Sequence, residues 1–293
     1  MSSRSADKIK IASFDDLFGE QVEVGVEQII NVKLSELHTF RNHPFKVKDD
    51  EKMQETVESI KEYGVLNPGL VRPRVEGGYE IIAGHRRKRG CELAGLEEMP
   101  VIVRDITDDE AIIVMVDTNI QRESLDYSEK AFAFKMKYDA MKHRGSKGTK
   151  TTAQEIGDEV GESGRQIQRY IRLTELIPEL LELVDAKKIG FIPAVDLSYL
   201  AKEEQGILSE IISERGIFPN INQAAQLKQY SATKELNRGM MMLILTAETK
   251  KEAKISLSTE KVSRFFPQGT SKQDIEAKIY ELLEKWNRGG TEQ

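Results

Sequence analysis

The sequence has few of the residues that build covalent or membrane-spanning frameworks. It contains a single cysteine, Cys91, in 293 residues, which excludes an intrachain disulfide network and a cysteine-based metal cluster. No apolar run approaches the roughly 20 residues that span a bilayer. The N-terminus lacks the apolar core and the small-residue cleavage site of a secretory signal. We therefore expect a protein of the reducing cytoplasm that does not contact a membrane.

An excess of positive charge is lacking as well. The chain carries 43 Lys and Arg against 49 Asp and Glu, a formal net charge of −6. Neutralising nucleic-acid phosphates requires Lys and Arg, so the overall balance does not favour a nucleic-acid partner. A local basic face can still lie on an acidic protein, so the distribution of the positive residues decides the question.

The length and the local patterns predict several structural units. Charged residues make up 31% and hydrophobic residues 39%, which fits a soluble and mostly helical chain longer than one domain. We expect an α+β protein, with a small N-terminal α/β domain, an all-helical domain and a small C-terminal strand and helix unit. The predicted boundaries are 1–25 for a flexible arm, 26–125 for the α/β domain, 126–229 for the helical domain, 230–253 for a linker and 254–293 for the C-terminal unit.

Apolar periodicity predicts the elements within these units. Strands are expected at 29–32, 70–73, 79–82 and 99–103, and helices at 49–63, 84–94, 108–118 and 128–142. Ser128 is the expected N-cap of the last of these helices. The C-terminal unit should contain a strand at 254–257 and a helix at 272–286, capped by Ser271 with Asp274.

Residues 153–173 have the pattern of a helix-turn-helix, with a tight turn at 161–164. Ile156 and Ile167 can lie on one buried side, and no acidic residue occurs from Arg165 to Arg172. Arginine can reach guanine or phosphate, and glutamine can reach adenine, in the major groove. The residues expected to contact DNA, including two lysines of the preceding basic loop, are Lys147, Lys150, Thr152, Gln154, Ser163, Arg165, Gln166, Gln168, Arg169 and Arg172. The alternative is an ordinary helical hairpin with a solvated charged face.

A second basic motif, Gly84-His85-Arg86-Arg87-Lys88-Arg89, follows a predicted strand and opens a predicted helix. Free N–H groups at such a turn bind anions, and arginine forks add bidentate bonds to phosphate oxygens. The chemistry alone leaves a nucleotide, the DNA backbone and a solvated face as alternatives. It excludes a Walker A loop, because no Lys-Ser or Lys-Thr follows the glycine. A further cluster, residues 118–122, is either a second polyphosphate contact or an ordinary helix C-terminus.

These motifs resemble the boxes of the ParB/Spo0J partition family. The family's phosphate box, Gly-Glu-Arg-Arg-x-Arg-Ala, is similar to residues 84–90, and its Glu-Asn-x-Gln-Arg box is similar to Thr118-Asn119-Ile120-Gln121-Arg122. Its Gly-x-x-x-Pro segment matches residues 64–68. The resemblance covers roughly residues 28–215. It implies a nucleotide site formed by Gly64, Pro68, Gly84, His85, Arg86, Arg87, Arg89, Asn119 and Arg122.

The resemblance also implies a mechanism. Family members are CTP-dependent DNA clamps, in which CTP and Mg²⁺ close the N-terminal domains of a homodimer around double-stranded DNA. The helix-turn-helix would bind a palindromic, centromere-like site, and Asn119 would help to hold Mg²⁺ with the nucleotide phosphates. A ParA-type ATPase is the expected partner, with Arg4, Lys8 and Lys10 of the arm as its contacts. The protein would be cytoplasmic and associated with the nucleoid.

Three positions depart from the family pattern. His85 and Thr118 replace glutamates, and Phe45 stands where the family has an arginine. Losing two carboxylates near a triphosphate removes groups that would order Mg²⁺ or water. We therefore expect nucleotide binding to persist and CTP hydrolysis to be slow or absent.

Two other functions remain as alternatives. One is a transcription or element-maintenance regulator that binds DNA without a nucleotide switch. The other is a nuclease or kinase built on the same α/β domain, for which His85 and Cys91 are the nearby candidate residues; Cys91 falls in an apolar helix segment typical of a buried side chain.

The last predicted helix carries an apolar stripe formed by Ile275, Ile279, Leu282, Leu283 and Trp286. It is either a dimer contact or a face packed within its own unit.

Overall fold

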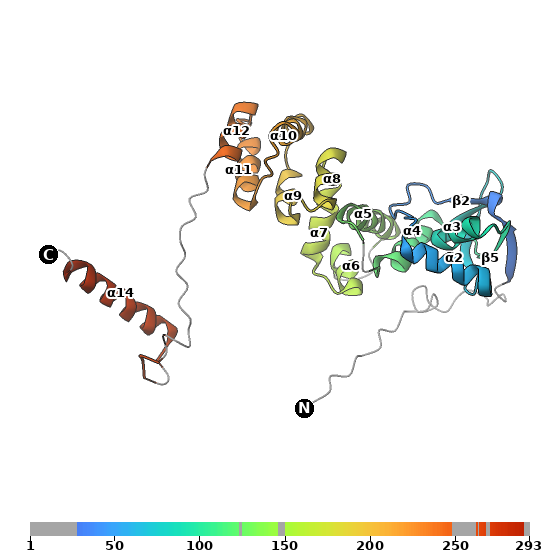
Figure 1. Ribbon diagram of the computed structural model, residues 1–293, viewed down its shortest axis with the longest axis horizontal. Helices are drawn as coiled ribbons and strands as arrows, with labels where there is room; N and C mark the ends of the chain where they lie inside the picture. Colours follow the sequence, from blue (N-terminus) through green and yellow to red (C-terminus); the bar gives the residue numbers. More distant parts are fainter. Residues whose placement is uncertain are drawn as a thin grey trace. The chain divides into compact units, whose positions relative to one another are not determined.

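The computed structural model describes residues 28–122, 125–145, 150–247, 262, 264–267 and 270–289, with side chains as far as residue 286. It divides into two units, one ending at Thr246 and one beginning at Ala247, each considered by itself (Figure 1). The arm predicted at 1–25, the strand predicted at 254–257 and Lys147 lie outside the described residues.

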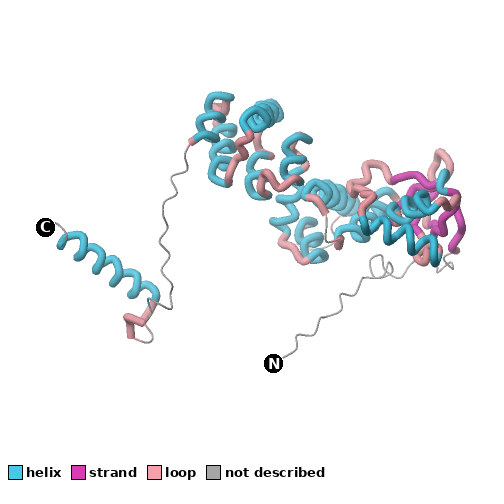
Figure 2. Tube along the Cα trace, viewed as in Figure 1, coloured by secondary structure: helices cyan, strands magenta, loops and turns pink. Residues whose placement is uncertain are grey.

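A five-stranded mixed sheet forms the N-terminal part of the first unit, where the strands of Figure 2 gather. The strands are β1 (Ile29–Lys33), β2 (Leu37–Thr39), β3 (Gly69–Pro73), β4 (Tyr79–Ala83) and β5 (Glu98–Val103), in the order β1-β5-β3-β4-β2. β1 pairs with β5 and β3 with β4 in antiparallel fashion, whereas β3 with β5 and β4 with β2 are parallel. Four strands were expected, and the short β2 was not, because three residues carry too little pattern to detect.

Helices cover both faces of this sheet. Because neighbouring residues of a strand point to opposite faces, Ile81 packs with Ile60 of α2 (Glu51–Tyr63) and Cys91 of α3 (His85–Ala94). Ile82 packs on the other side with Met115 of α4 (Asp108–Ile120). All of these side chains are buried, so β4 lies between two hydrophobic layers and the residues that follow it are held rigidly.

The rest of the first unit is helical. Its helices are α5 (Tyr127–Arg144), α6 (Thr152–Val160), α7 (Gly164–Leu173), α8 (Pro178–Asp185), α9 (Phe191–Leu197), α10 (Lys202–Arg215), α11 (Ile221–Ala232) and α12 (Arg238–Thr246). One large cluster, which includes Leu173, Leu197, Leu208 and Leu227, forms the core of α7 to α12. A second cluster, which includes Ile156, packs α6 against α5 and α7. No helix within the described ranges has both the length and the apolarity to cross a bilayer.

Two local expectations need correction. The N-cap of α5 is Asp126, whose N–H donates to Glu129 at 2.8 Å, and not Ser128. Ser128 lies inside the helix and donates from its backbone N–H to Asp185 at 2.9 Å. The segment 238–246, expected within a linker, forms α12 with Met241 fully buried in the helical core. The segment is rich in methionine and aliphatic residues, which pack into a core and are not typical of a solvent-exposed linker.

A buried lysine joins the α/β part to the helical part. Lys137 of α5 is 1% exposed, and its ammonium group contacts Asp117 of α4 and Glu159 of α6. A buried ammonium requires such partners, because desolvation disfavours an isolated charge. The ion pairs therefore tie the end of α4 to the first helix of the predicted helix-turn-helix.

The second unit contains α14 (Lys272–Gly289). Ser271 caps it as predicted, accepting a hydrogen bond from the backbone N–H of Asp274 at 3.2 Å.

Candidate nucleotide and DNA sites

The phosphate motif lies at a strand-to-helix turn, as the sequence predicts. Gly84 follows β4 with φ +117° and forms the N-cap of α3. An added Cβ there would lie 3.2 Å from the Cα of Gly69, so glycine allows both the backbone conformation and the close approach of β3. The first backbone N–H groups of α3 have no acceptor within the helix, which makes this end a favourable position for an anion.

Two of the motif's arginines pair with carboxylates at the start of α2. Arg86 donates to Asp50 at 3.2 Å, and Arg89 forms a two-point contact with Asp49 at 2.7 and 3.1 Å. These hydrogen bonds lower the pKa of both carboxyl groups. All four side chains are partly exposed, so these are surface ion pairs that cost little to exchange for another anion.

Arg87 has a different role from its neighbours. Its guanidinium group donates to the carbonyl of Asn67 at 2.7 Å and also to the carbonyl of Pro68. Burial lowers its pKa. Arg87 thus fixes the loop of residues 64–68, which matches the family's Gly-x-x-x-Pro segment, against the start of α3. Gly64 ends α2 with φ +72° and is exposed at the other end of this loop.

Two histidines lie at this turn. The rings of His43 and His85 are in contact, with centroids 3.8 Å apart and planes tilted by 39°. The Nε2 atom of each ring is buried and has no hydrogen-bond partner among the described residues. Burial lowers the pKa of His43 to about 4 and that of His85 to about 3. Charge repulsion from Arg122 lowers both pKa values further. Arg122, a residue of the second cluster, therefore lies close to the phosphate motif.

The second cluster, residues 118–122, occupies the end of α4 and the two residues that follow it. Asn119 is 6% exposed, and its amide nitrogen donates to the carbonyl of Met115 at 2.8 Å. Thr118 hydrogen-bonds to the carbonyl of Val114 at 2.9 Å. These bonds are those of an ordinary helix end. Arg122 makes no such cap; burial lowers its pKa, and Arg86 lowers it further. Two guanidinium groups that repel one another favour an anion between them.

A magnesium site is not preformed by side chains. Within the described ranges, no group of three or more His, Cys, Asp or Glu residues is close enough to hold a metal ion. The carboxylates that contact the motif, Asp49, Asp50 and Glu92, are already paired with its basic side chains. Mg²⁺ at this place would depend mainly on oxygens of a bound phosphate chain, with Asn119 beside them.

The nearby candidates for an enzyme do not form a catalytic arrangement. Cys91 is fully buried, and burial raises the pKa of its thiol, so the thiolate needed for nucleophilic attack is disfavoured. The ring of His85 contacts that of His43, and among the described residues its buried Nε2 atom has no hydrogen-bond partner.

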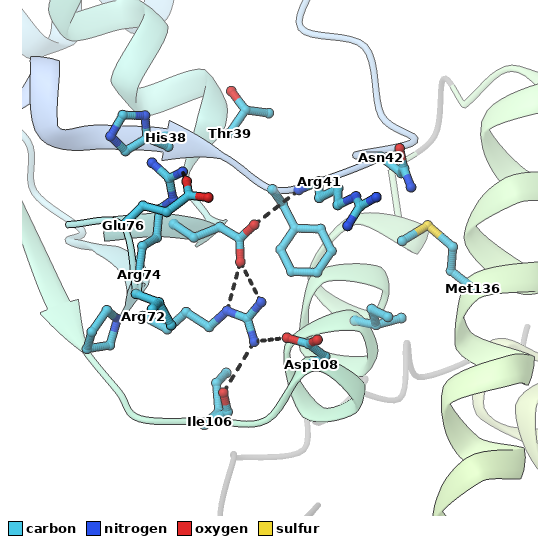
Figure 3. A pocket seen from close by; sticks show the side chains of 15 residues that line it. His38, Thr39, Arg41, Asn42, Arg72, Arg74, Glu76, Ile106, Asp108 and Met136 are labelled. Atoms are coloured by element: carbon cyan, nitrogen blue, oxygen red, sulfur yellow. Dashed lines mark hydrogen bonds and ion pairs between the residues drawn. The ribbon is translucent and has the colours of Figure 1, made fainter. Parts of the chain in front are cut away.

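A separate hollow of about 1030 Å³ is lined by residues of β2, β3, β4, α4 and α5 (Figure 3). None of the predicted site residues lines it. Its charged residues largely neutralise one another. Arg72 donates to Glu80 at 2.8 Å and contacts Asp108 at 2.6 Å, as Figure 3 shows for Asp108. Arg74 pairs with Glu76. The basic side chains at the start of α3 are therefore the better candidate for a phosphate site than this hollow.

The helix-turn-helix prediction matches two packed helices, α6 and α7. Ile156 and Ile167 are fully buried between them, and the turn is close. An added Cβ on Gly157 would lie 2.5 Å from the carbonyl oxygen of Glu162, and one on Gly164 would lie 2.9 Å from Gln154. Two glycines thus allow the backbones to meet. Ser163 caps α7 by accepting from the N–H of Gln166 at 3.2 Å.

The predicted DNA contacts divide into free and engaged side chains. Arg165 and Gln168 are exposed and Arg169 is half-buried; among the described residues neither arginine has an ion-pair partner. Thr152 is half-buried at the first turn of α6. Gln154 caps α6 by accepting from the N–H of Thr151 at 3.0 Å, and Lys150 pairs with Asp158 at 2.5 Å.

Arg172 is not free to read DNA in this structure. Its guanidinium group donates to the carbonyl of Ser198 at 2.8 Å and lies 4.2 Å from the ring centre of Tyr199. Helical periodicity predicts that Arg172 faces outward, but α9 covers that part of α7. Gln166, near the start of the helix, hydrogen-bonds to Tyr170 and lowers the pKa of its hydroxyl, against the larger effect of burial.

Several site residues were missed by the sequence reasoning. His43, Asp49 and Asp50 approach the motif only in the folded chain, from the segment before α2. An acidic pair at the start of a helix is typical of an ordinary N-terminus, so the pattern gave no sign of a partner 36 to 40 residues away. His43 adjoins a proline, and nothing local distinguishes it.

Comparison with known proteins identifies similar chains. The profile of the ParB N-terminal domain matches residues 19–120. A chromosome-partitioning protein Spo0J of Thermus thermophilus is 33% identical over 201 residues, which cover 69% of this chain and 70% of the relative. A probable chromosome 1-partitioning protein ParB of Deinococcus radiodurans is 29% identical over 249 residues, which cover 85% of this chain and 82% of the relative.

One solved structure is that of a C-terminally truncated chromosome-partitioning protein ParB from Caulobacter crescentus complexed with CTP-gamma-S. It is 26% identical, and the match covers 64% of this chain and 99% of the chain in that structure, with a TM-score of 0.31. This TM-score is low, so the weight of the comparison lies with the sequence relatives.

Proposed function

The chain belongs to the ParB/Spo0J family of chromosome-partitioning proteins, and on that premise we propose that it is a CTP-dependent DNA clamp. It is a DNA-binding partition protein, which acts in the segregation of a chromosome or plasmid. In the proposal, the start of α3 binds the triphosphate of CTP and the helix-turn-helix binds a palindromic, centromere-like duplex. Two copies form the clamp, in the cytoplasm and on the nucleoid.

The nucleotide site rests on one observation above all. Arg86 and Arg122 interact beside the open N-terminus of α3. Arg86 lowers the pKa of Arg122, and Arg122 lowers the pKa of His85. Like charges held together in this way are stabilised by a polyanion. Arg89 and Arg86 can exchange their exposed carboxylates for phosphate oxygens, and Arg87 already holds the loop that would lie near the base.

The DNA site rests on the exposed side of α7. Arg165, Gln168 and Arg169 lie on one face and can reach base edges or phosphates, while Ser163 caps the helix beside them. Lys150 and the preceding basic loop would add backbone contacts that weaken with salt. In this proposal Arg172 supports α7 through Ser198 and does not read bases.

The remaining parts of the proposal follow from the family. Mg²⁺ would bind with the phosphates beside Asn119, and a ParA-type ATPase would be the partner of the N-terminal arm. Hydrolysis of CTP is expected to be slow or absent, because His85 and Thr118 stand in place of carboxylates that would order the metal ion or water.

The test is titration calorimetry of the full chain with CTP and Mg²⁺, with and without a cognate palindromic duplex. We expect CTP to bind, and to bind more tightly when the cognate duplex is present. Because linkage is reciprocal, CTP should then raise the affinity for that duplex by the same factor. Arg86→Ala should weaken CTP binding by about tenfold or more, given about 1.5–3 kcal/mol for a bond to a charged group. Arg74→Ala, which alters an arginine of the distant hollow, is the matched control. No CTP binding in either condition contradicts the proposal.

A nucleotide-independent regulator is the second candidate, favoured by the replacement of both glutamates with His85 and Thr118. It predicts site-specific duplex binding that is unchanged by CTP, and no sliding from the site on closed DNA.

A further inference from the structure

The contacting rings of His43 and His85 hold two buried nitrogen atoms whose role the proposed triphosphate site leaves open. Both rings lie at the start of α3, and both bury an Nε2 atom that has no partner among the described residues. Buried polar atoms are nearly always hydrogen-bonded, so two orphaned atoms in adjacent rings need an explanation.

The tautomer of His43 is set by its surroundings. Its Nδ1 atom lies 2.8 Å from the carbonyl oxygen of Phe45, and a carbonyl can only accept. The neutral ring therefore carries its proton on Nδ1 and presents a bare lone pair at Nε2. This lone pair can receive a metal ion, a hydrogen-bond donor or a proton.

The surrounding charges decide among these three. Arg122 faces both rings, Lys88 of α3 lies near His85, and Arg86 lies near Arg122. Glu129 of α5 is the acidic group beside Arg122, and it already accepts the backbone N–H of Lys46 at 2.7 Å. Cations around the pair oppose a bound metal ion and favour an anion. An anion beside Nε2 is bound well only when that nitrogen carries a proton.

We propose that His43 and His85 are phosphate-binding residues that take up a proton when the triphosphate of a nucleotide binds at the start of α3. This inference rests on the proposed nucleotide site and adds its regulation. In the empty site both rings are neutral. Burial and Arg122 hold the pKa of His43 at about 4, and burial, repulsion from His43 and the nearby Arg122 and Lys88 hold that of His85 at about 3. A phosphate chain reverses the local charge, offers an acceptor to each Nε2–H and raises both pKa values. Binding should therefore tighten as the pH falls.

The experiment measures CTP binding to the full chain between pH 6.0 and 8.0, in buffers of different ionisation enthalpy, so that proton uptake is obtained directly. Affinity should rise by up to about tenfold per pH unit for each proton taken up. Because the terminal phosphate of CTP also titrates near this range, the decisive quantity is the difference between wild type and variants. His43→Asn keeps a donor for the Phe45 carbonyl and His85→Gln keeps an amide near the Nε2 position, but neither titrates.

We expect proton uptake to be lower in both variants and unchanged in His38→Gln, an exposed histidine of β2. NMR titration of the histidine rings in the wild type should show both pKa values rising when CTP or inorganic triphosphate is added, and this readout needs no variant to fold. If CTP binds with equal proton uptake in wild type and variants, the inference is overturned while the proposed function stands. If neither CTP nor triphosphate binds at any pH, the nucleotide site itself is wrong.

Discussion

At the scale of single residues, a run of arginines that reads as one basic motif divides into separate roles. Arg86 and Arg89 are held by exposed carboxylates and can turn to a ligand. Arg87 is committed to the backbone of residues 67 and 68. The same residue type therefore serves binding in two positions and structure in the third.

Replacing Arg87 tests this division. Arg87→Ala leaves two backbone carbonyls without their donor, and we expect a loss of about 1–3 kcal/mol in local stability. Arg89→Ala, the matched control, removes only exposed ion pairs with Asp49 and Glu92 and should leave stability nearly unchanged. Amide hydrogen exchange of β3 and β4 in the full chain measures both. Equal protection in the two variants would contradict a structural role for Arg87.

The histidine pair predicts how stability depends on pH in the absence of nucleotide. The pKa of each ring is lower in the folded chain, at about 4 and about 3, than the ordinary 6.5. Between the folded pKa values and 6.5, the unfolded chain therefore binds more protons than the folded chain. The free energy of unfolding rises with pH over this range. We expect the melting temperature to fall as the pH drops from 6.5 towards 4. His85→Gln should flatten this fall, and an unchanged slope would show that the ring is protonated in the folded protein.

At the scale of elements, close packing of α6 on α7 depends on two glycines. Gly157 lies against the carbonyl of Glu162, which is backbone and cannot rotate away, whereas Gly164 lies partly against the side chain of Gln154. The conformation of the turn before Arg165 therefore depends on the absence of side chains at these two glycines. It does not depend on the outward-facing residues that would bind DNA.

A pair of alanine substitutions tests this packing. Gly157→Ala places a Cβ 2.5 Å from the Glu162 oxygen, so the turn must shift, and we expect a loss of about 1–3 kcal/mol and weaker DNA binding. Gly206→Ala, in helix α10 with nothing within 4 Å, is the control and should stabilise the chain by up to about 1 kcal/mol. Thermal unfolding and duplex binding report the two effects. Normal duplex binding by Gly157→Ala would mean that the turn is not held as described.

At the scale of the whole molecule, the C-terminal unit presents an apolar face without a partner among the described residues of its own unit. Leu282 and Leu283 are each 53% exposed and Trp286 is 76% exposed, while Ile275 and Ile279 are half-buried. Such a stripe on an 18-residue helix is suited to a second copy of the chain.

Truncation tests this contact. A chain ending before residue 250 should be monomeric in light scattering, whereas the full chain should be dimeric. The change Leu282→Lys in the full chain should weaken the dimer by placing a charge in the contact. Glu281→Gln, on the side of α14 away from the stripe, serves as the control. A truncated chain that remains dimeric would locate the interface elsewhere.

The sequence by itself determined the α+β class, the strand-to-helix turn at Gly84, the two helices around the turn at 161–164 and the apolar stripe of α14. These depend on interactions within a few residues: turn glycines, N-caps and helical spacing. The ordered boxes of residues 64–68, 84–90 and 118–122 are likewise local patterns, and their order along the chain is enough to indicate the partition family.

Only the tertiary structure decided which side chains meet. Folding brings His43 and the carboxylates before α2 to the phosphate motif, turns Arg172 onto α9 and buries Lys137 between Asp117 and Glu159. Each of these contacts joins residues that are distant in the chain. Their free energies come from burial and charge pairing across elements, which leave no periodic signal in either segment alone, and so the sequence could identify the motif but not its partners.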